Sequence, residues 1–391
     1  MSVNSGLVER FHVSIPQRVI DDLHQRLRQT RWPDDVANAD WSYGFNCAYL
    51  QELVRYWLDE YDWRHQEAQI NQYPQFKADI DGVPIHFIHV RGKGPNPRPL
   101  ILTHGYPWTF WDYRKLIEPL TDPAAHGGDA ADAFDVVIPS LPGYVFSSPL
   151  QTTGIDFTRT ADLWVRLMRD VLGYDKFAAH GGDWGAMVTA QLGHKYAEHL
   201  LGIHLVTAIP LDVHSNGLPD SSFYGPGEEG WHAYNSEKLA AGSGYMVVQS
   251  TRPQTLAYAM HDSPAGLCAW IVEKSRDWSD CGGNVETRFS KDDLLNKVML
   301  YWVSNSFVSA ARYYYEAAHR PWAPSHPRQP VVQAPTAILA FMQDVIRMPK
   351  RWMEQTYNLQ RLNYSESGGH FSPVEEPQRV ASDIREFFRS R

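Results

Sequence analysis

The residues Gly181 to Gly185 (GGDWG) combine a reactive side chain with a backbone pattern that can present it. They follow a strand-like segment (KFAAH) and precede a helix-like one (AMVTAQLGHKY). The arrangement G-x-nucleophile-x-G is typical of a nucleophile elbow, a sharp turn that needs small flanking residues, and here Asp183 stands where Ser is usual. A second GGD at residues 127–129 has no preceding strand and no second flanking glycine, so it is interpreted as a loop. A purely structural turn is the alternative interpretation of GGDWG.

An aspartate at such a turn restricts the chemistry. Attack of a carboxylate on a carbonyl would give only a labile anhydride, whereas attack on an electrophilic sp3 carbon gives an alkyl ester that water can later cleave. Epoxides and alkyl halides are the obvious electrophiles. Cleavage of the ester then needs a base that activates water and an oxyanion hole for the tetrahedral intermediate.

A base and its orienting carboxylate are available near the end of the chain. His370, in Ser367–Phe371 (SGGHF), lies between the last expected strand and the last expected helix, and Asp344 follows the strand TAILAF. The chain order Asp183, Asp344, His370 is the nucleophile, acid, histidine order of α/β-hydrolases. Asp212, after the strand IHLVTAIPL, is the alternative acid.

Two backbone N–H groups are expected to form the oxyanion hole, those of Trp184 and Tyr106. Tyr106 belongs to HGYP, a turn after the strand PLILT in which a cis bond before Pro107 is plausible. An ordinary tight turn is the alternative there. His104 and His180, although next to strand ends, are interpreted as structural.

The elements that must position these residues alternate between strands and helices. Short β-branched runs predict strands at 83–90, 99–103, 134–138, 177–179, 203–208, 336–341 and 359–364. A helix is expected at 158–172, an amphipathic one at 15–27 and a final one through 380–388. Alternation of this kind predicts a mostly parallel sheet in an α/β fold. Between about residues 213 and 330 the pattern is helical instead, with a capping box at Ser290 to Asp293.

Composition excludes several classes of protein. The 36 Lys and Arg against 45 Asp and Glu give a net charge of −9, the wrong sign for a nucleic-acid partner. The three cysteines (Cys47, Cys268 and Cys281) form neither a disulfide framework nor a zinc pattern. No leader pattern or membrane-length apolar run is found, so we expect no membrane span and a cytoplasmic location. Aromatic residues make up 13%, which suits a pocket for an apolar ligand or an aromatic-rich core.

A set of motifs along nearly the whole chain carries a family resemblance. They are RWPD (31–34), HGYP (104–107), GGDWG (181–185), SGYM (243–246), DSPAGL (262–267), MLYW (299–302), RYYYE (312–316), GGHF (368–371) and EEP (375–377). With these motifs the chain resembles the α/β-hydrolase-fold epoxide hydrolases, in the microsomal-like branch that has its own N-terminal domain.

The resemblance implies two lid tyrosines that bind and protonate the epoxide oxygen, and the motifs match them to Tyr245 and Tyr314. Tyr313 and Tyr315 are neighbours that leave the second choice open. Chemically a phenol suits the role because it can donate a hydrogen bond to the ring oxygen. Mammalian microsomal members carry a membrane anchor, which we do not expect in this protein, and a Glu where this chain has Asp344. This expectation favours a free soluble enzyme.

Together these observations predict an α/β-hydrolase core at 76–212 and 331–391, a helical lid at 213–330 and an N-terminal segment at 1–75 that wraps the core. The predicted activity is hydrolysis of an apolar epoxide to a vicinal diol without cofactor or metal, with a small hydrophobic substrate as partner and a homodimer left open. Two alternatives remain. One is a haloalkane dehalogenase, in which the Asp-Trp pair at the elbow would hold the halide, and the other is a non-catalytic protein that binds a hydrophobic ligand.

Overall fold

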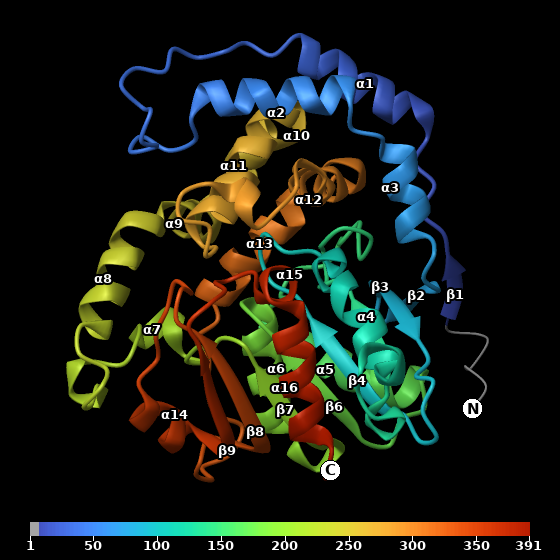
Figure 1. Ribbon diagram of the computed structural model, residues 1–391, viewed down its shortest axis with the longest axis vertical. Coiled ribbons are helices and arrows are strands. Elements are labelled where there is room, and N and C mark those ends of the chain that lie inside the picture. Colours follow the sequence, from blue (N-terminus) through green and yellow to red (C-terminus); the bar gives the residue numbers. More distant parts are fainter. Residues whose placement is uncertain (1–7) are drawn as a thin grey trace.

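Nine strands form one sheet in the computed structural model, which describes residues 8–391 (Figure 1). The strand order is β1-β2-β3-β5-β4-β6-β7-β8-β9. The pairs β1/β2, β2/β3 and β3/β5 are antiparallel, and the remaining neighbours are parallel, which confirms the predicted mostly parallel sheet. The strands are β1 (Val8–Phe11), β2 (Gln75–Ile80), β3 (Val83–Val90), β4 (Arg98–Thr103), β5 (Phe134–Pro139), β6 (Phe177–Gly181), β7 (Leu200–Leu205), β8 (Val332–Phe341) and β9 (Tyr357–Ser365).

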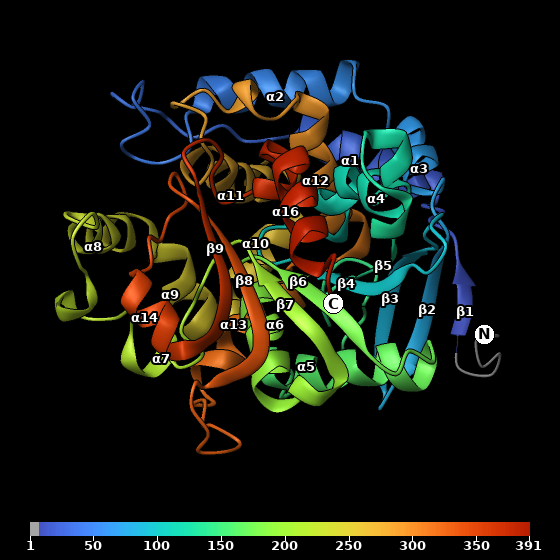
Figure 2. The ribbon, with the colours of Figure 1, turned by 60° about the horizontal axis from the view of Figure 1, so that its bottom comes forward.

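Helices cover both faces of this sheet (Figure 2). On one face lie α5 (Phe157–Arg166), which continues in a π-helical turn (Leu167–Val171), and α6 (Trp184–Lys195). On the other lie α4 (Arg114–Thr121) and α16 (Pro377–Phe388), whose apolar residues recur at helical spacing and are buried. Because both faces are covered, the residues of the central strands β5 and β6 are buried on both sides of the sheet.

A helical insertion separates β7 from β8 and forms the lid. It consists of α7 (Val213–Asn216), α8 (Trp231–Gly242), α9 (Gly244–Thr251), α10 (Pro253–Asp262), α11 (Pro264–Asp277), α12 (Lys291–Ser304) and α13 (Phe307–Ala318). The capping box expected at the start of α12 is present, since Asp293 N donates to Ser290 Oγ and Ser290 N donates to Asp293 Oδ2.

The N-terminal part of the chain joins the sheet to the lid. β1 extends the sheet by pairing with β2, and α1 (Gln17–Arg28), α2 (Cys47–Asp59) and α3 (Trp63–Ile70) follow it. In Figure 1 the first two helices lie above the lid helices. Tyr61 Oη donates to Asn296 Oδ1 of α12 at 2.6 Å, and Arg26 pairs with Asp262 of α10. This part of the chain therefore holds the lid as well as the core; residues 1–7 of the predicted segment lie outside the described residues.

The structure departs from the predicted elements at three strands, one of which is β2 (Gln75–Ile80), which was not among the predicted strands. The strand predicted at 203–208 is found at Leu200–Leu205, because the chain leaves the sheet there and Thr207 turns its hydroxyl to Asp344. Strand β1 was not predicted, because four residues (VERF) carry too short an alternation and their strand conformation depends on pairing with β2. Two short helices, α14 (Lys350–Thr356) and α15 (Ser372–Glu375), complete the C-terminal part.

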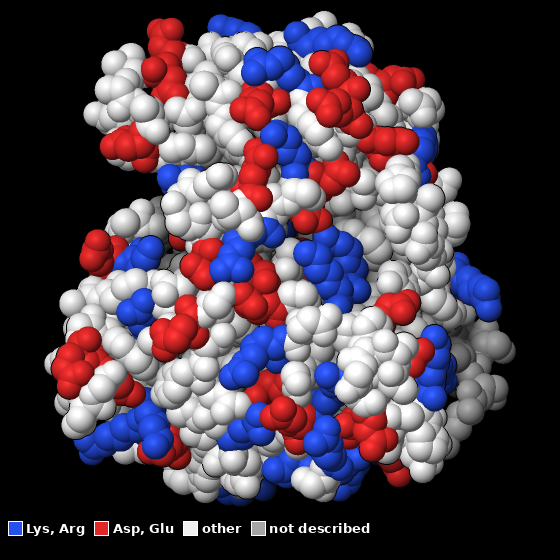
Figure 3. All heavy atoms as spheres, viewed as in Figure 1, with Lys and Arg blue, Asp and Glu red and all other residues white. Residues whose placement is uncertain are grey.

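Charges of both signs are interspersed over the face of the molecule drawn in Figure 3. Within residues 8–391, none of the helices has both the length and the apolar character needed to cross a bilayer.

Candidate active site

Asp183 lies at the turn between β6 and α6, in the backbone conformation expected of a nucleophile elbow. Its φ of +54° and ψ of −128° fall in a region that L-residues rarely adopt. The turn tolerates no side chain at Gly185, where a Cβ atom would lie 1.8 Å from the carbonyl oxygen of Thr103 on β4. The small residues in GGDWG are therefore required by close packing of α6 against the sheet.

His370 lies between two carboxylates. Its Nδ1 is 2.8 Å from Asp344 Oδ1, and its Nε2 is 3.3 Å from Asp183 Oδ2. Asp344 is held in turn by the backbone N–H of Val345 (2.7 Å, to Oδ1) and the hydroxyl of Thr207 (2.6 Å, to Oδ2). The imidazole is thus oriented at one nitrogen, and its other nitrogen faces Asp183.

The alternative acid lies elsewhere. Asp212 begins the short helix α7, and its carboxylate accepts a hydrogen bond from Asn216 Nδ2 at 2.7 Å. Of the two candidates, the structure brings Asp344 to the histidine.

The two carboxylates also control the charge of His370. Burial alone would lower its pKa, but the negative charges of Asp344 and Asp183 and the close polar contacts with both carboxylates outweigh burial and raise the pKa to about 10. With Asp183 ionised, His370 is protonated at neutral pH. A change in the charge of Asp183 must therefore alter the basicity of His370.

The carboxylate of Asp183 also accepts a hydrogen bond from the HGYP turn, which was expected to supply one donor of the oxyanion hole. Tyr106 N–H donates to Asp183 Oδ1 at 2.7 Å, and the Tyr106–Pro107 peptide bond is cis. The second expected donor, the N–H of Trp184, makes no hydrogen bond to this carboxylate within the described residues. Trp184 directly follows Asp183 at the start of α6, so its N–H lies at the end of the helix that favours negative charge.

Tyr245 of α9 and Tyr314 of α13 contact each other edge to face at the cavity that Asp183 also lines. Their ring centroids are 5.7 Å apart at an interplanar angle of 81°, and Tyr106 stacks on Tyr245 with centroids 6.0 Å apart. Burial raises the pKa of both phenols, and the charge of Asp183 adds to this shift. Both hydroxyls therefore keep their protons near neutral pH and remain hydrogen-bond donors.

The neighbours of Tyr314 point elsewhere. Tyr313 Oη forms a hydrogen bond with Thr160 Oγ1 at 2.8 Å within the core, and Tyr315 is 38% exposed and stacks on His319. Of the three tyrosines in this run, Tyr314 lines the cavity.

A cavity of about 520 Å³ connects these groups. Asp183, His370, Tyr245 and Tyr314 all line it, and most of its remaining lining is apolar, including Met187, Ile209, Leu218, Met246, Trp278 and Ile346. This size and lining suit a small organic molecule with few polar groups. In the described part of the chain, no cluster of His, Cys, Asp or Glu has the geometry to hold a metal ion.

His104 and His180, which were interpreted as structural, form buried hydrogen bonds with residues other than the catalytic candidates. His104 Nε2 accepts from Leu141 N–H at 3.0 Å, and His180 contacts His204 at 2.9 Å within the buried sheet. Sequence reasoning missed Thr207, which holds Asp344, and Trp278, whose ring lies 5.1 Å from His370. Thr207 follows a strand and could have been singled out on that ground, whereas no sequence signal identifies Trp278.

A doubly covered α/β sheet with an elbow carboxylate, a His–Asp pair and an inserted helical lid defines a hydrolase of the α/β-hydrolase fold. Family models agree: residues 98–232 match "alpha/beta hydrolase fold" and residues 8–113 match "Epoxide hydrolase N terminus".

Comparison with known proteins gives the family. A protein of Stigmatella aurantiaca is 43% identical over 97% of this chain and 84% of its own length, and epoxide hydrolase 1 of Oryctolagus cuniculus is 36% identical over 97% of this chain and 88% of its own. The crystal structure of juvenile hormone epoxide hydrolase from the silkworm Bombyx mori superposes with a TM-score of 0.87 at 28% identity, covering 99% of this chain and 96% of that one. The chain belongs to the microsomal-type epoxide hydrolases, and it is a hydrolase that acts on ether bonds.

Proposed function

We propose that the enzyme converts an apolar epoxide to a vicinal diol through a covalent ester on Asp183. The observation that carries this proposal is the position of His370, which contacts both Asp183 and Asp344 in a cavity that Tyr245 and Tyr314 also line. One cavity therefore holds a carboxylate for attack, two phenols for the epoxide oxygen and a base for water.

In the first step a carboxylate oxygen of Asp183 attacks one carbon of the epoxide ring, and the bond from that carbon to the ring oxygen breaks. Tyr245 and Tyr314 donate hydrogen bonds to the ring oxygen, and one phenol transfers its proton to the alkoxide that forms. The products are a hydroxyalkyl ester on Asp183 and one tyrosinate.

A proton then moves from His370 to the tyrosinate. Ester formation removes one of the two negative charges that raise the pKa of His370, so the proton of His370 becomes easier to lose. The transfer restores the phenol and leaves a neutral imidazole. Attack by Asp183 thus prepares the base for the second step.

In the second step His370 Nε2 takes a proton from water, and the resulting hydroxide attacks the carbonyl carbon of the ester. The N–H groups of Tyr106 and Trp184 stabilise the oxyanion of the tetrahedral intermediate. Collapse breaks the acyl C–O bond and releases the diol, whose second hydroxyl receives its proton from the newly formed acid of Asp183. Asp183 is again a carboxylate and His370 again carries a proton, so protons balance over the cycle.

The cavity lining favours an apolar epoxide. Outside the proposed reacting groups the wall is mainly aliphatic and aromatic, with residues such as Met187, Ile209 and Ile346. An apolar substrate gains free energy from burial against such side chains, and the few polar groups orient the ring.

A single turnover in ¹⁸O-labelled water tests the covalent route. With enzyme in excess over a styrene-type epoxide, the first diol should contain no ¹⁸O, because its new oxygen comes from Asp183. The label should appear instead in the peptide that contains Asp183. Label in the first diol would mean that water attacks the epoxide directly and that Asp183 acts only as a base.

A further inference from the structure

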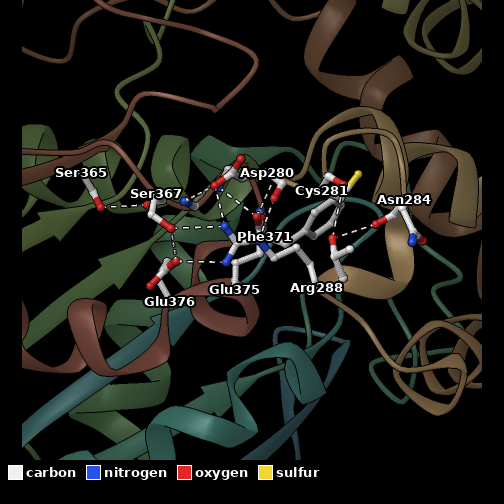
Figure 4. A network of polar contacts seen from close by, with 12 residues as sticks. Asp280, Cys281, Asn284, Arg288, Ser365, Ser367, Phe371, Glu375 and Glu376 are labelled. Atoms are coloured by element: carbon white, nitrogen blue, oxygen red, sulfur yellow. Dashed lines mark hydrogen bonds and ion pairs between the residues drawn. The ribbon is translucent and has the colours of Figure 1, made fainter.

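The backbone on both sides of His370 is bonded to one buried carboxylate, that of Glu375 in α15. Glu375 Oε1 accepts from the N–H of Phe371 at 2.9 Å, and Oε2 accepts from the N–H of Gly369 at 3.0 Å. Glu375 is 9% exposed. The loop that carries His370 is therefore fixed immediately before and immediately after the imidazole (Figure 4).

The same carboxylate also reaches into the lid. Glu375 Oε2 accepts a third hydrogen bond, from the N–H of Asp280 at 2.8 Å, in the connection between α11 and α12. Burial raises the pKa of Glu375, and the three N–H donors oppose this shift by stabilising the charged form. A buried acceptor with three main-chain donors is costly to disturb, because any lost bond leaves a buried polar group unpaired.

The lid connection contacts His370 directly as well. The backbone N–H of His370 donates to the carbonyl oxygen of Trp278 at 2.8 Å. The Trp278 indole lies edge-on to the His370 imidazole, with centroids 5.1 Å apart, and 5.2 Å from the ring of Tyr245. Trp278 also lines the cavity, so a single lid residue touches the substrate space, the proposed base and one proposed acid.

Gly369 allows this close approach. A Cβ atom at Gly369 would lie 2.7 Å from the carbonyl oxygen of Trp278 and 2.9 Å from the N atom of Asp280. Any side chain there would separate the loop from the lid.

Arg288 adds a second, more exposed set of contacts between the His370 loop and the lid connection at Asp280. Its guanidinium forms ion pairs with the carboxylates of Asp280 (2.5 Å) and Glu376 (3.1 Å). It also donates hydrogen bonds to the carbonyl oxygen of Asp280 (2.7 Å) and the hydroxyl of Ser367 (3.2 Å). Figure 4 shows these groups around the arginine, with residues of the lid and of the His370 loop on either side. The outer network thus joins the same two segments that Glu375 joins inside.

We propose that Glu375 is a positioning residue for His370: it ties the loop of the base to the lid segment that carries Trp278, and so sets the position of Nε2 for attack of water on the ester. This inference rests on the proposed function, in which His370 acts in the second step. Because Glu375 bonds to the backbone beside His370 and not to the helices that carry the two tyrosines, loss of Glu375 should slow the second step far more than the first.

The variant Glu375→Gln tests the inference. An amide has the shape of the carboxylate, but whichever way it is oriented its NH₂ group faces at least one of the three backbone donors. We expect the rate constant for ester hydrolysis to fall by about 10- to 100-fold, the effect of a small misplacement of a catalytic group. The rate constant for ester formation should stay within about twofold of the wild type. Rapid-quench single turnovers, with the ester measured on the Asp183 peptide, give both values.

Two further measurements separate positioning from a general structural role. Glu375→Gln should lower the plateau of the pH profile for hydrolysis without moving its midpoint, because Asp344 still partners His370. Glu366→Gln is the matched control, since Glu366 is exposed on the same loop and makes no side-chain hydrogen bond within residues 8–391. It should behave as the wild type.

If Glu375→Gln does not fold, Arg288→Gln replaces it. Arg288 is only partly buried, and its loss weakens the same contact from outside, so a smaller loss confined to hydrolysis is expected. Equal slowing of both steps, or wild-type hydrolysis in a folded variant, overturns the inference. If even the wild type forms no ester on Asp183, the proposed function itself is wrong, and the positioning role is lost with it.

Discussion

The rings of Tyr245 and Tyr314 meet nearly at right angles, with centroids 5.7 Å apart, although they come from helices separated by most of the lid. Both line the cavity that contains Asp183. The proposed donation of hydrogen bonds by both phenols to one epoxide oxygen therefore requires α9 and α13 to pack together.

Removing either hydroxyl should slow ring opening. We expect Tyr245→Phe and Tyr314→Phe to lower the rate constant for ester formation by roughly 10- to 10⁴-fold, the range for loss of a positioned acid, and the double variant to be slower still. Single-turnover measurements of the Asp183 ester give this rate constant.

The neighbouring tyrosines are the controls. Tyr315→Phe changes an exposed side chain and should leave ester formation unaltered. Tyr313→Phe removes a buried hydrogen bond to Thr160 and should lower the free energy of unfolding by about 1 kcal/mol without slowing the chemistry. If Tyr313→Phe slowed ester formation and Tyr314→Phe did not, the choice of tyrosine would be wrong.

The acid that orients His370 should be Asp344. In Asp344→Asn the Nδ1 atom of His370 faces a neutral amide, which does not hold the imidazole in the tautomer that leaves Nε2 free to accept a proton. Ester hydrolysis should therefore slow by up to roughly 10⁴-fold. Asp212→Asn should have little effect, because Asp212 bonds to Asn216 rather than to the histidine. Steady-state turnover of both variants on one epoxide checks the ranking, and the reverse order would move the role to Asp212.

The pH dependence of hydrolysis should follow the charge around His370. Asp344 and Asp183 together raise the pKa of His370 to about 10, and ester formation cancels the charge of Asp183. In the ester His370 should therefore lose its proton at a lower pH than in the free enzyme. Because the neutral imidazole is the base, the hydrolysis rate constant should rise with pH and level off above this lower pKa.

Asp344→Asn provides the comparison for this profile. Removing the second carboxylate takes away another interaction that raises the pKa of His370, so the midpoint should move to still lower pH while the plateau falls. The rate constant for hydrolysis of preformed ester, measured between about pH 5 and pH 10, shows the shift of the midpoint. This range includes the pKa of an ordinary histidine. A midpoint that stayed in place would mean that Asp344 does not act on His370 through its charge.

The elbow should tolerate no larger residue at Gly185. A Cβ atom there would overlap the Thr103 carbonyl oxygen, so Gly185→Ala must push α6 from β4 and should cost about 3 kcal/mol of stability or more. Gly244→Ala is the matched control, because a Cβ at Gly244 meets nothing within 4 Å in helix α9. Urea unfolding of both variants measures the difference, and equal stabilities would show that the elbow is not tightly packed.

Much of the site could be predicted because local sequence and chain order carry it. The elbow needs glycines at fixed positions, and His370 and Asp344 each follow a strand whose apolar run is visible in the sequence. Tyr245 and Tyr314 came from motif resemblance, since nothing in their spacing indicates that two helices pack there. The cytoplasmic location, the homodimer and the domain limits stay predictions.

The rest depends on contacts between distant segments. Glu375 looked like one acidic residue in EEP, and its role appears only when three backbone N–H groups from two segments converge on it. Strand β1 likewise depends on its partner β2 rather than on its own four residues. Nearly every residue type has a backbone N–H group, so the sequence does not show which of these groups will donate to Glu375 or to a neighbouring strand.

The last prediction concerns the intermediate itself. In His370→Gln, Asp183 keeps its carboxylate and the tyrosines keep their hydroxyls, so ring opening should proceed, but water lacks its base. The ester should accumulate, and the variant should gain the mass of one substrate on the peptide that contains Asp183. Intact-protein and peptide mass spectrometry detect this adduct, with His370→Gln/Asp183→Asn as the control that cannot form it. A folded, substrate-binding His370→Gln enzyme that stayed unmodified would rule out the covalent route and leave Asp183 as a base that activates water, because the covalent route requires the ester to form before His370 acts on water.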